Sequence, residues 1–323
     1  MKKYIIRRFL MFIPLLVGIT IISFTVMHLT PGSPVDEFVM NPNVDARARE
    51  RFYKIYGLDQ PLYKQYAGWV VNVVTFDFGR SFRDGRKVMD KIGDRLPATL
   101  LLNILSLTLI FAVAVPIGVI SAVKHNSFTD RIFTLMVFAG YSLPAFALAL
   151  MLMYFFGVKL GWLPVSGMVS VNFSYLTLWG KVADLIKHLI LPVVTSAVGG
   201  LAFMSRYMRS TVLEVMRQDF IKAVRARGVR KKRVITVHVF RNALIPLVTL
   251  FGLLIPSLIG GSVVFETIFS WPGMGRLAYG AIMSRDYPVV MGVGIIMALL
   301  TLAGNLIADI GYAAVDPRIR YRE

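Results

Sequence analysis

Six long apolar stretches constrain the fold of this chain more than any other feature. They are sufficiently free of charge, and in all but one case long enough, to cross about 30 Å of hydrocarbon as a helix. The fourth is short, and we expect its helix to begin a turn earlier, near Leu185. With a mean hydropathy of +0.65 and 56% hydrophobic residues, the chain is typical of a polytopic membrane protein, because soluble domains do not collect apolar residues into runs of this length. The six stretches are Phe9–Leu29, Ala98–Val123, Ile132–Val158, Leu189–Met204, Ala243–Phe265 and Tyr287–Ala308.

These stretches predict an all-α membrane protein of six transmembrane helices, with a small extracytoplasmic insertion after the first. The first stretch follows Lys2, Lys3, Arg7 and Arg8 but is 21 residues long with no small-residue cleavage site after it, so we interpret it as a retained span and not a signal peptide. Prolines inside the stretches predict kinks and not breaks, because neighbouring helices can pair with the freed carbonyls. They are Pro116, Pro144, Pro192, Pro246 and Pro256.

Basic residues predict the orientation. They gather before the first stretch, around Lys124 and Arg131, in a loop at 205–242 and in the tail. If the six spans alternate, all four groups face the same side, which is the cytoplasm under the positive-inside rule. The predicted organisation comprises a cytoplasmic N-terminus and first span (1–29), an extracytoplasmic insertion (30–97), a five-span core (98–311) that contains the basic loop 205–242, and a cytoplasmic tail (312–323).

Several kinds of chemistry find little support in the sequence. The chain has no cysteine and no G-x-x-x-x-G-K-[ST] nucleotide loop, and its four histidines are scattered, so we expect it to bind no cofactor or metal and to be no enzyme. The second, third, fifth and sixth stretches carry no Asp, Glu, Lys or Arg in their interiors. Such residues or broken helices usually form the ion sites of secondary carriers, so a secondary carrier or channel is the less favoured alternative, and an intramembrane enzyme a further one.

The loop 205–242 is the most basic part of the chain, with eleven Lys or Arg against two acids. Within it, the sequence Asp219–Gly228 predicts a short helix. Asp219 caps its start, and Arg225 and Arg227 lie in the last turn, where the helix dipole favours positive charge. Gly228 adopts the left-handed conformation that ends the helix. Phe220, Ala223, Val224 and Arg227 share one face, which Ile221 widens. On residue chemistry alone, three interpretations stay open, namely docking on a partner protein, lying on anionic lipid, and a solvated charge run.

Residues 209–228 read Arg-Ser-Thr-Val-Leu-Glu-Val-Met-Arg-Gln-Asp-Phe-Ile-Lys-Ala-Val-Arg-Ala-Arg-Gly, and Arg241-Asn242-Ala-Leu-Ile-Pro follows a basic spacer. This stretch resembles the coupling loop of ABC-importer permeases of the dipeptide, oligopeptide and nickel branch. The glutamate of the wider family's E-A-A motif is replaced by Lys222. Further matches cover nearly the whole chain: Thr30-Pro-Gly-Ser-Pro34, Gly57-Leu-Asp-Gln-Pro-Leu-Tyr-Lys-Gln-Tyr66, Glu266-Thr-Ile-Phe-Ser-Trp-Pro-Gly-Met-Gly275, Arg285-Asp-Tyr-Pro288 and Asp316-Pro-Arg-Ile-Arg320.

The resemblance implies a permease subunit of an ATP-driven importer in a bacterial or archaeal inner membrane. Its implied partners are a second homologous permease subunit, two ATPase subunits that bind ATP and Mg²⁺, an extracytoplasmic substrate-binding protein and the lipid bilayer, with no nucleic acid. Dipeptides, longer peptides, nickel chelates and oligosaccharides all remain candidate substrates. The residues implied in ATPase coupling are Asp219, Phe220, Ile221, Lys222, Ala223, Val224, Arg225, Ala226, Arg227, Gly228, Arg241 and Asn242.

Three further residues lie near the outer ends of the fifth and sixth stretches. Glu266, Trp271 and Asp286 are candidates for an outer gate or a docking rim. The alternative for the two acids is that they are solvated loop residues, which acidic side chains most often are.

Overall fold

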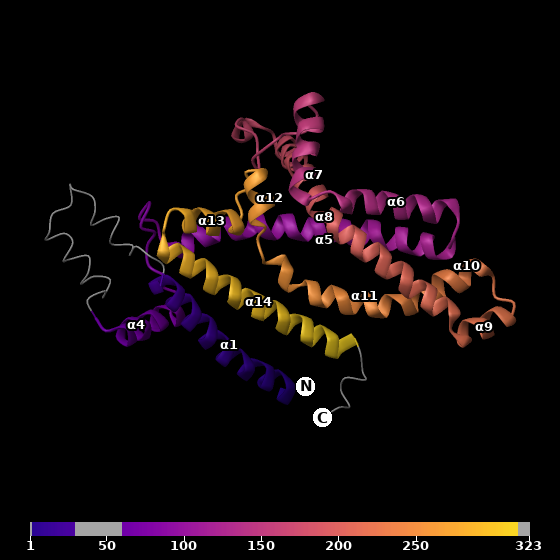
Figure 1. Cartoon of the computed structure of the whole chain (residues 1–323), viewed down its shortest axis with the longest axis horizontal. Helices are drawn as coiled ribbons and strands as arrows, with labels where there is room; N and C mark the ends of the chain where they lie inside the picture. Colours follow the sequence, from indigo (N-terminus) through magenta and orange to yellow (C-terminus); the bar gives the residue numbers. More distant parts are fainter. Residues whose placement is uncertain (1, 30–59, 316–323) are drawn as a thin grey trace. The chain divides into compact units, whose positions relative to one another are not determined.

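The computed structural model describes residues 2–29 and 60–315 (Figure 1). In these ranges the extended regular elements are helices, and one antiparallel bridge joins Arg80 and Lys87. The Thr30–Pro34 motif and the tail motif from Asp316 lie outside the described residues. The helices are α1 (Lys2–Leu29), α4 (Leu62–Val74), α5 (Val88–Val123), α6 (Phe128–Ser142), α7 (Ala145–Leu152), α8 (Leu178–Arg217), α9 (Asp219–Ala226), α10 (Lys231–Arg233), α11 (Phe240–Leu254), α12 (Val263–Ile268), α13 (Met274–Met283) and α14 (Tyr287–Val315), with π-helical turns η1 (Met153–Lys159) and η3 (Val234–Val239) and 3₁₀ turns η2 (Phe173–Tyr175) and η4 (Pro256–Leu258).

Within the described residues, four helical segments are long and apolar enough to cross a membrane. They are Val88–Val123, Leu178–Arg217, Lys231–Leu254 and Tyr287–Ala308. The pair of α6 with α7 and η1 is a candidate fifth span, and a shorter apolar stretch, Leu10–Val26, lies in α1. The all-helical membrane fold is confirmed, whereas the number of six spans stays a prediction.

The third apolar stretch is not one kinked helix. It is broken by a 98° bend between α6 and α7, so the prediction of a kink at Pro144 is wrong. Leu143 is extended, with φ −85° and ψ 136°, which is the conformation that a following proline favours because its ring crowds the helical one. Pro144 also lacks the N–H that would continue the hydrogen-bond ladder of α6.

The fifth stretch is broken as well. The helix α11 ends at Leu254, the turn η4 begins at Pro256, and α12 begins only at Val263, so Pro256 marks a break and not a kink. By contrast, Pro192 and Pro246 do lie inside continuous helices. The fourth stretch extends far beyond its predicted ends, because α8 runs for 40 residues from Leu178 to Arg217.

The described chain forms two compact units. Among the described residues, the first comprises 2–29, 60–97, 259–263 and 273–315. In it, α1 packs beside α14, and α13 beside α14. Its core is formed by apolar side chains from the start of α5, from α13 and from α14: Val88, Ile92, Met274, Ala281, Val289, Val293, Ile295 and Ile296, with Phe78 from the preceding loop.

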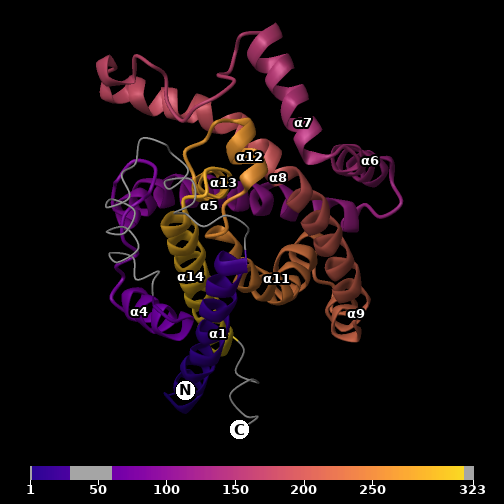
Figure 2. The ribbon, with the colours of Figure 1, turned by 60° about the vertical axis from the view of Figure 1, so that its left-hand side comes forward.

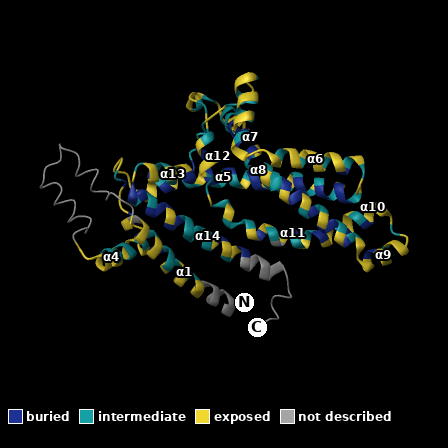
Figure 3. Cartoon of the chain, in the orientation of Figure 1, coloured by how far each residue is buried: buried dark blue, intermediate teal, exposed yellow. Residues whose placement is uncertain are grey.

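The second unit comprises residues 98–258 and 264–272. Here α8 is the central helix, since α6, α7, α9 and α11 all pack against it. Figure 3 shows buried residues along α8, whereas α6 and α7 are mostly exposed. Exposed apolar residues are expected on a membrane protein, because lipid takes the place of water around them.

Gly118 of α5 allows α5 and α8 to approach each other closely. A Cβ atom added at Gly118 would lie 2.6 Å from the Cβ of Met208 and 2.7 Å from the carbonyl oxygen of Ser205. One of these two atoms belongs to the backbone of α8 and cannot rotate away. Small residues of this kind let membrane helices approach closely, where van der Waals packing holds them together.

We therefore predict that Gly118→Ala destabilises the fold by about 1–3 kcal/mol, as overpacking of a close contact does. The midpoint of thermal unfolding of the detergent-purified chain measures this change. Gly294→Ala is the matched control, because a Cβ at Gly294 in α14 meets no atom within 4 Å. Equal midpoints for the two variants would contradict the close α5–α8 contact.

Candidate functional site

The predicted helix in the basic loop is present as α9, from Asp219 to Ala226. Arg227 ends it, and Gly228 follows with φ +74°, so the predicted left-handed end is confirmed. The prediction that Asp219 caps the helix is wrong. Gln218 occupies the N-cap position without a side-chain cap bond, and the Asp219 carboxylate instead accepts a 2.8 Å bond from Lys222 Nζ.

Only one side of α9 is packed against its own chain. Ile221 is fully buried and Val224 is partly buried beside it, whereas Phe220 is 41% exposed and Ala223 is exposed. The predicted single apolar face is therefore divided in two: Ile221 and Val224 point inward, and Phe220 and Ala223 remain on the surface. Four residues after Ala223 on that outer side lies the exposed Arg227.

The pocket around Ile221 is built from four other helical segments. Besides Ile221, the buried residues of this cluster are Ala114 and Ala122 from α5, Met204, Met208, Val212 and Val215 from α8, Val234 and Val239 from η3, and Ala243 and Leu247 from α11. Full burial of an isoleucine side chain contributes about 1.5–3 kcal/mol. The helix α9 packs against α8 and η3, and the same cluster continues from these segments to α5 and α11. Interiors pack densely and transmit displacement.

The remaining predicted coupling residues surround this anchor. Lys222, Arg225 and Ala226 are exposed on α9. At the start of α11, Arg241 is exposed and the side-chain amide of Asn242 donates a 2.6 Å bond to the carbonyl of His238. The segment η3, which ends at Val239 just before α11, packs against α9, so the structure brings the two parts of the motif into one region, visible at the end of α8 in Figure 2.

A buried acid beside this region was missed in the sequence. Asp130, 3% exposed on α6, accepts two bonds from Arg209 of α8, at 3.0 Å from Nε and 2.8 Å from one terminal nitrogen. Asp130 also accepts from the backbone N–H of Asn126, and the Ser127 side chain accepts from the backbone N–H of Asp130. The Ser-x-x-Asp pattern is a helix-start signature that would have located this residue.

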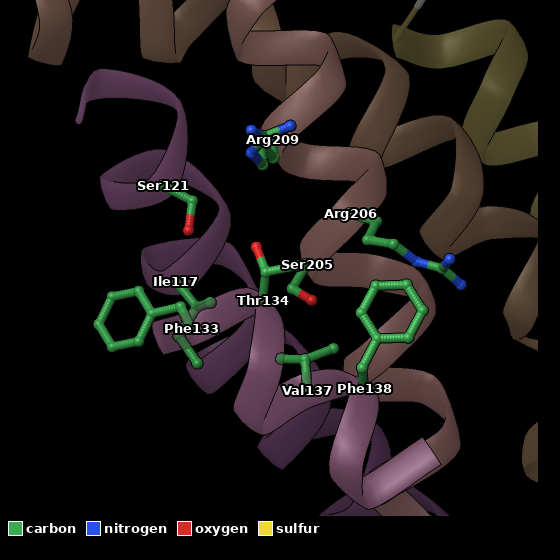
Figure 4. Close-up of a pocket in the computed structure, with 9 residues that line it drawn as sticks. All are labelled: Ile117, Ser121, Phe133, Thr134, Val137, Phe138, Ser205, Arg206 and Arg209. Carbon is green, nitrogen blue, oxygen red and sulfur yellow. The ribbon is translucent and has the colours of Figure 1, made fainter. Parts of the chain in front are cut away.

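Figure 4 shows the space between α5, α6 and α8 next to this pair. It is a small cavity of about 20 Å³, with the hydroxyl groups of Ser121, Thr134 and Ser205 at its wall. A space of this size holds about one water molecule. The guanidinium of Arg206 lies 5.1 Å from the ring centre of Phe138 at its edge. The cavity is thus too small for a substrate, and the region serves to hold α6 on α8.

Glu266 and Trp271 lie in the interior of the second unit, both 0% exposed. Thr99 donates a 3.0 Å bond to Glu266 Oε1, and the Trp271 indole N–H donates a 2.9 Å bond to the carbonyl of Ala98. The backbone N–H of Trp271 also donates to the Glu266 carbonyl at 2.8 Å. These bonds fasten α12 and the segment after it to the second-unit part of α5.

Asp286 lies in the first unit and is 2% exposed. Its carboxylate accepts bonds from the Ser81 hydroxyl at 2.5 Å and the Phe82 N–H at 3.0 Å. Lys91 joins this group by donating to Ser81 and to Asp84, and its ammonium lowers the pKa of Asp84 to about 2. The interpretation of Glu266 and Asp286 as solvated loop acids is therefore wrong, while a part in a gate or docking rim stays a prediction.

In the part of the chain that the structure describes, no three acidic or histidine side chains are grouped as a metal site would need. The geometry instead provides a short helix that is anchored on one side and free on the other, at the end of a long membrane helix. Such an element can bind a partner and pass on its displacement, without any bond being made or broken.

Comparison with known proteins gives two family matches that together span nearly the whole chain. Residues 114–321 match the family described as binding-protein-dependent transport system inner membrane component, and residues 1–103 match its N-terminal region. The oligopeptide transport system permease protein AppB of Bacillus subtilis is 46% identical over 99% of this chain and 100% of its own length. The glutathione transport system permease protein GsiC of Escherichia coli is 38% identical over 100% of both chains.

The fold also resembles a solved structure. A chain from the inward-facing MetNI methionine ABC transporter aligns with a TM-score of 0.51, at 20% identity, over 69% of this chain and 97% of its own length. This likeness concerns the fold alone. The sequence matches show that the chain belongs to the family of binding-protein-dependent transport system inner membrane components, the permease subunits of ABC importers.

Proposed function

We propose that this permease carries peptides inward across the membrane and that α9 is the element that couples it to an ATPase. The observation that carries the proposal is the two-sided packing of α9. Ile221 is inserted in a core shared with α5, α8 and α11, whereas Phe220, Arg225 and Arg227 remain on the surface. A partner that grips the outer side therefore moves the membrane helices behind the inner side.

The charge of this region favours a protein partner with an acidic groove. Exposed basic residues follow one another along α9, the turn after it and α10: Lys222, Arg225, Arg227, Arg230, Lys231, Lys232 and Arg233. An exposed aromatic beside arginines is a common anchor of protein interfaces. A lipid surface would also attract the charge, but it would not account for the anchoring of α9 in a multi-helix core.

In this proposal the chain makes and breaks no covalent bond itself. Two ATPase subunits bind ATP with Mg²⁺, and their closure pushes α9 as a rigid body. The core around Ile221 passes the displacement to α5, α8 and α11, and the Arg209–Asp130 pair passes it from α8 to α6. A bistable helical bundle can convert such a push into alternating inward- and outward-open states.

The proposal assigns four kinds of partner and one orientation. A second, homologous permease completes the path, two ATPases dock on the cytoplasmic side, and a substrate-binding protein delivers the substrate outside. Both termini and α9 face the cytoplasm, as the basic residues favour. Peptides are preferred over nickel chelates or oligosaccharides because AppB and GsiC are named for oligopeptide and glutathione transport.

The energy source tests this function directly. In vesicles that contain the assembled complex and its binding protein, we expect uptake of a tripeptide mixture to stop when vanadate blocks the ATPases. Uptake should persist when an uncoupler removes the proton gradient. The opposite pattern would establish a secondary carrier and reject the proposal.

The two sides of α9 should respond differently to truncation. Ile221→Ala should lower the stability of the purified permease by about 2–5 kcal/mol, because it opens a cavity in the shared core. Phe220→Ala should change stability by less than about 0.5 kcal/mol, as most surface substitutions do, while weakening ATPase binding at least about tenfold.

Thermal unfolding of the permease alone and ATPase binding to the detergent-purified permease separate these two effects. Unaltered ATPase binding by Phe220→Ala would contradict docking through the outer side of α9. An unaltered unfolding midpoint for Ile221→Ala would contradict the anchoring.

The left-handed end of α9 gives a further prediction. A Cβ added at Gly228 meets no atom within 4 Å, so a substitution there acts through backbone strain and not through crowding. Gly228→Val should therefore cost about 1–2 kcal/mol locally and reduce peptide-stimulated ATP hydrolysis while membrane insertion persists. Gly228→Asn is the matched control, because asparagine tolerates this conformation. Equal loss in both variants would show that the backbone conformation is not the cause.

A further inference from the structure

The break between α6 and α7 lies at an unusual depth for irregular backbone. The residues that face it from α8 are Thr195, Val198 and Gly199. They lie in the middle of the apolar stretch Leu189–Met204, and therefore near the middle of the bilayer. The 98° bend consequently places a helix end and a helix start where the surrounding medium offers no hydrogen bonds.

The backbone at this break needs a polar environment. In a continuous helix the carbonyl of Gly140 would pair with the N–H of residue 144, which is a proline and has none. The Ser142 hydroxyl donates 2.7 Å to the carbonyl of Phe138, which leaves the later carbonyls of α6 still without a helical partner. Tyr141, Ser142, Leu143 and Pro144 are all exposed on this chain.

Hydrocarbon cannot solvate such groups, at a cost of several kcal/mol for each. Irregular backbone at membrane depth persists only where it is buried in protein or lines a water-filled cavity. The structure shows a cavity at this place. About 410 Å³ lies inside the bend, lined by Gly140, Tyr141 and Ser142 of α6 and by Thr195, Val198 and Gly199 of α8, among others.

We infer that this cavity, here named the elbow cavity, is a binding site for the backbone of a short peptide on the translocation path. The inference rests on the proposed function and adds the site through which the substrate passes. A volume of 410 Å³ lies within the range of small-molecule sites. It is about twenty times the volume of the cavity in Figure 4.

The chemistry of the lining fits a peptide backbone better than any particular side chain. No acidic or basic residue is among the described residues that line the elbow cavity. The carbonyls at the end of α6 can accept bonds from peptide N–H groups, and the Tyr141 hydroxyl can donate to a peptide carbonyl. The Ser142 hydroxyl already donates to Phe138, and its oxygen can still accept from a peptide N–H. A neutral site of this kind serves substrates of many sequences, because it pairs with groups that all peptides share.

Gly199 has a specific place in this site. A Cβ atom added there meets no atom within 4 Å, so the glycine is not required for packing within this chain. Its effect is to leave the wall of the cavity open, where a peptide backbone can approach the α8 backbone closely. A large side chain at this position would enter the cavity without displacing a neighbour.

Substituted-cysteine labelling tests the inference without depending on transport, and the chain has no native cysteine. In the assembled complex in vesicles, a hydrophilic methanethiosulfonate reagent should modify Ser142→Cys at least about tenfold faster than Val194→Cys, since only the former lines a water-filled space. Val194 is the matched control because it is exposed and adjacent to Thr195 but does not line the cavity. Equal slow labelling of both, with ATP-driven uptake intact, would reject the elbow cavity while leaving the proposed function in place.

Occupancy tests the ligand. During turnover with binding protein, ATP and a tripeptide mixture, labelling of Ser142→Cys should slow at least about threefold, because a bound peptide excludes the reagent. Labelling at an unchanged rate would reject a peptide site.

A plugging variant provides an independent test. Gly199→Phe should cut tripeptide uptake at least about tenfold by filling the cavity, and Val194→Phe, at the same depth outside it, should not. Normal unfolding midpoints and normal ATPase binding would show that both variants fold. Full uptake by a folded Gly199→Phe complex would reject the site, whereas loss of ATP dependence in the unmodified complex would instead reject the proposed function.

Discussion

Backbone hydrogen bonding in a medium that offers none is the constraint on which this structure depends. Every N–H and C=O inside the hydrocarbon must find a partner within the protein or in trapped water. This requirement makes the long apolar stretches helical, and it also makes each interruption informative. The interruptions at Pro144 and between Leu254 and Val263 have to be compensated by side chains, by neighbouring helices or by a polar space.

The compensation differs between the two interruptions. Near the second, the side-chain amide of Asn103 donates 2.7 Å to the carbonyl of Leu258, and Glu266 and Trp271 tie the following segment to Thr99 and Ala98. This break is closed by protein. At Pro144 the described contacts include the Ser142 hydroxyl bond within α6 and a cavity on the side of α8, which is why we assign the pathway to the first interruption and a structural role to the second.

The contacts that connect α9 to the membrane helices are the second feature on which the fold depends. The helix α9 has only eight residues, too few to be stable alone in water, and it owes its order to Ile221 in the core of the second unit. The helix α8 is in turn joined to its neighbours by two kinds of contact. It shares an apolar core with α5 and α11, and Arg209 joins it to Asp130 of α6. A pair with one partner almost fully buried specifies geometry more than it adds stability, and geometry is what a coupling element needs.

The sequence by itself determined the class of protein, the approximate position of each apolar stretch, the short helix at Asp219 and its left-handed end at Gly228. These follow from periodicity, composition and local backbone preference, which act over a few neighbouring residues. Its motifs also pointed to the family that the comparisons confirm. Only the tertiary structure decided that Ile221 and not Phe220 faces inward, that Asp130 is the partner of Arg209, and that Glu266 and Asp286 are interior. It also decided that Pro144 breaks its helix while Pro192 does not, because pairing and burial depend on residues distant in sequence, and no local pattern records which of two apolar neighbours will meet the core.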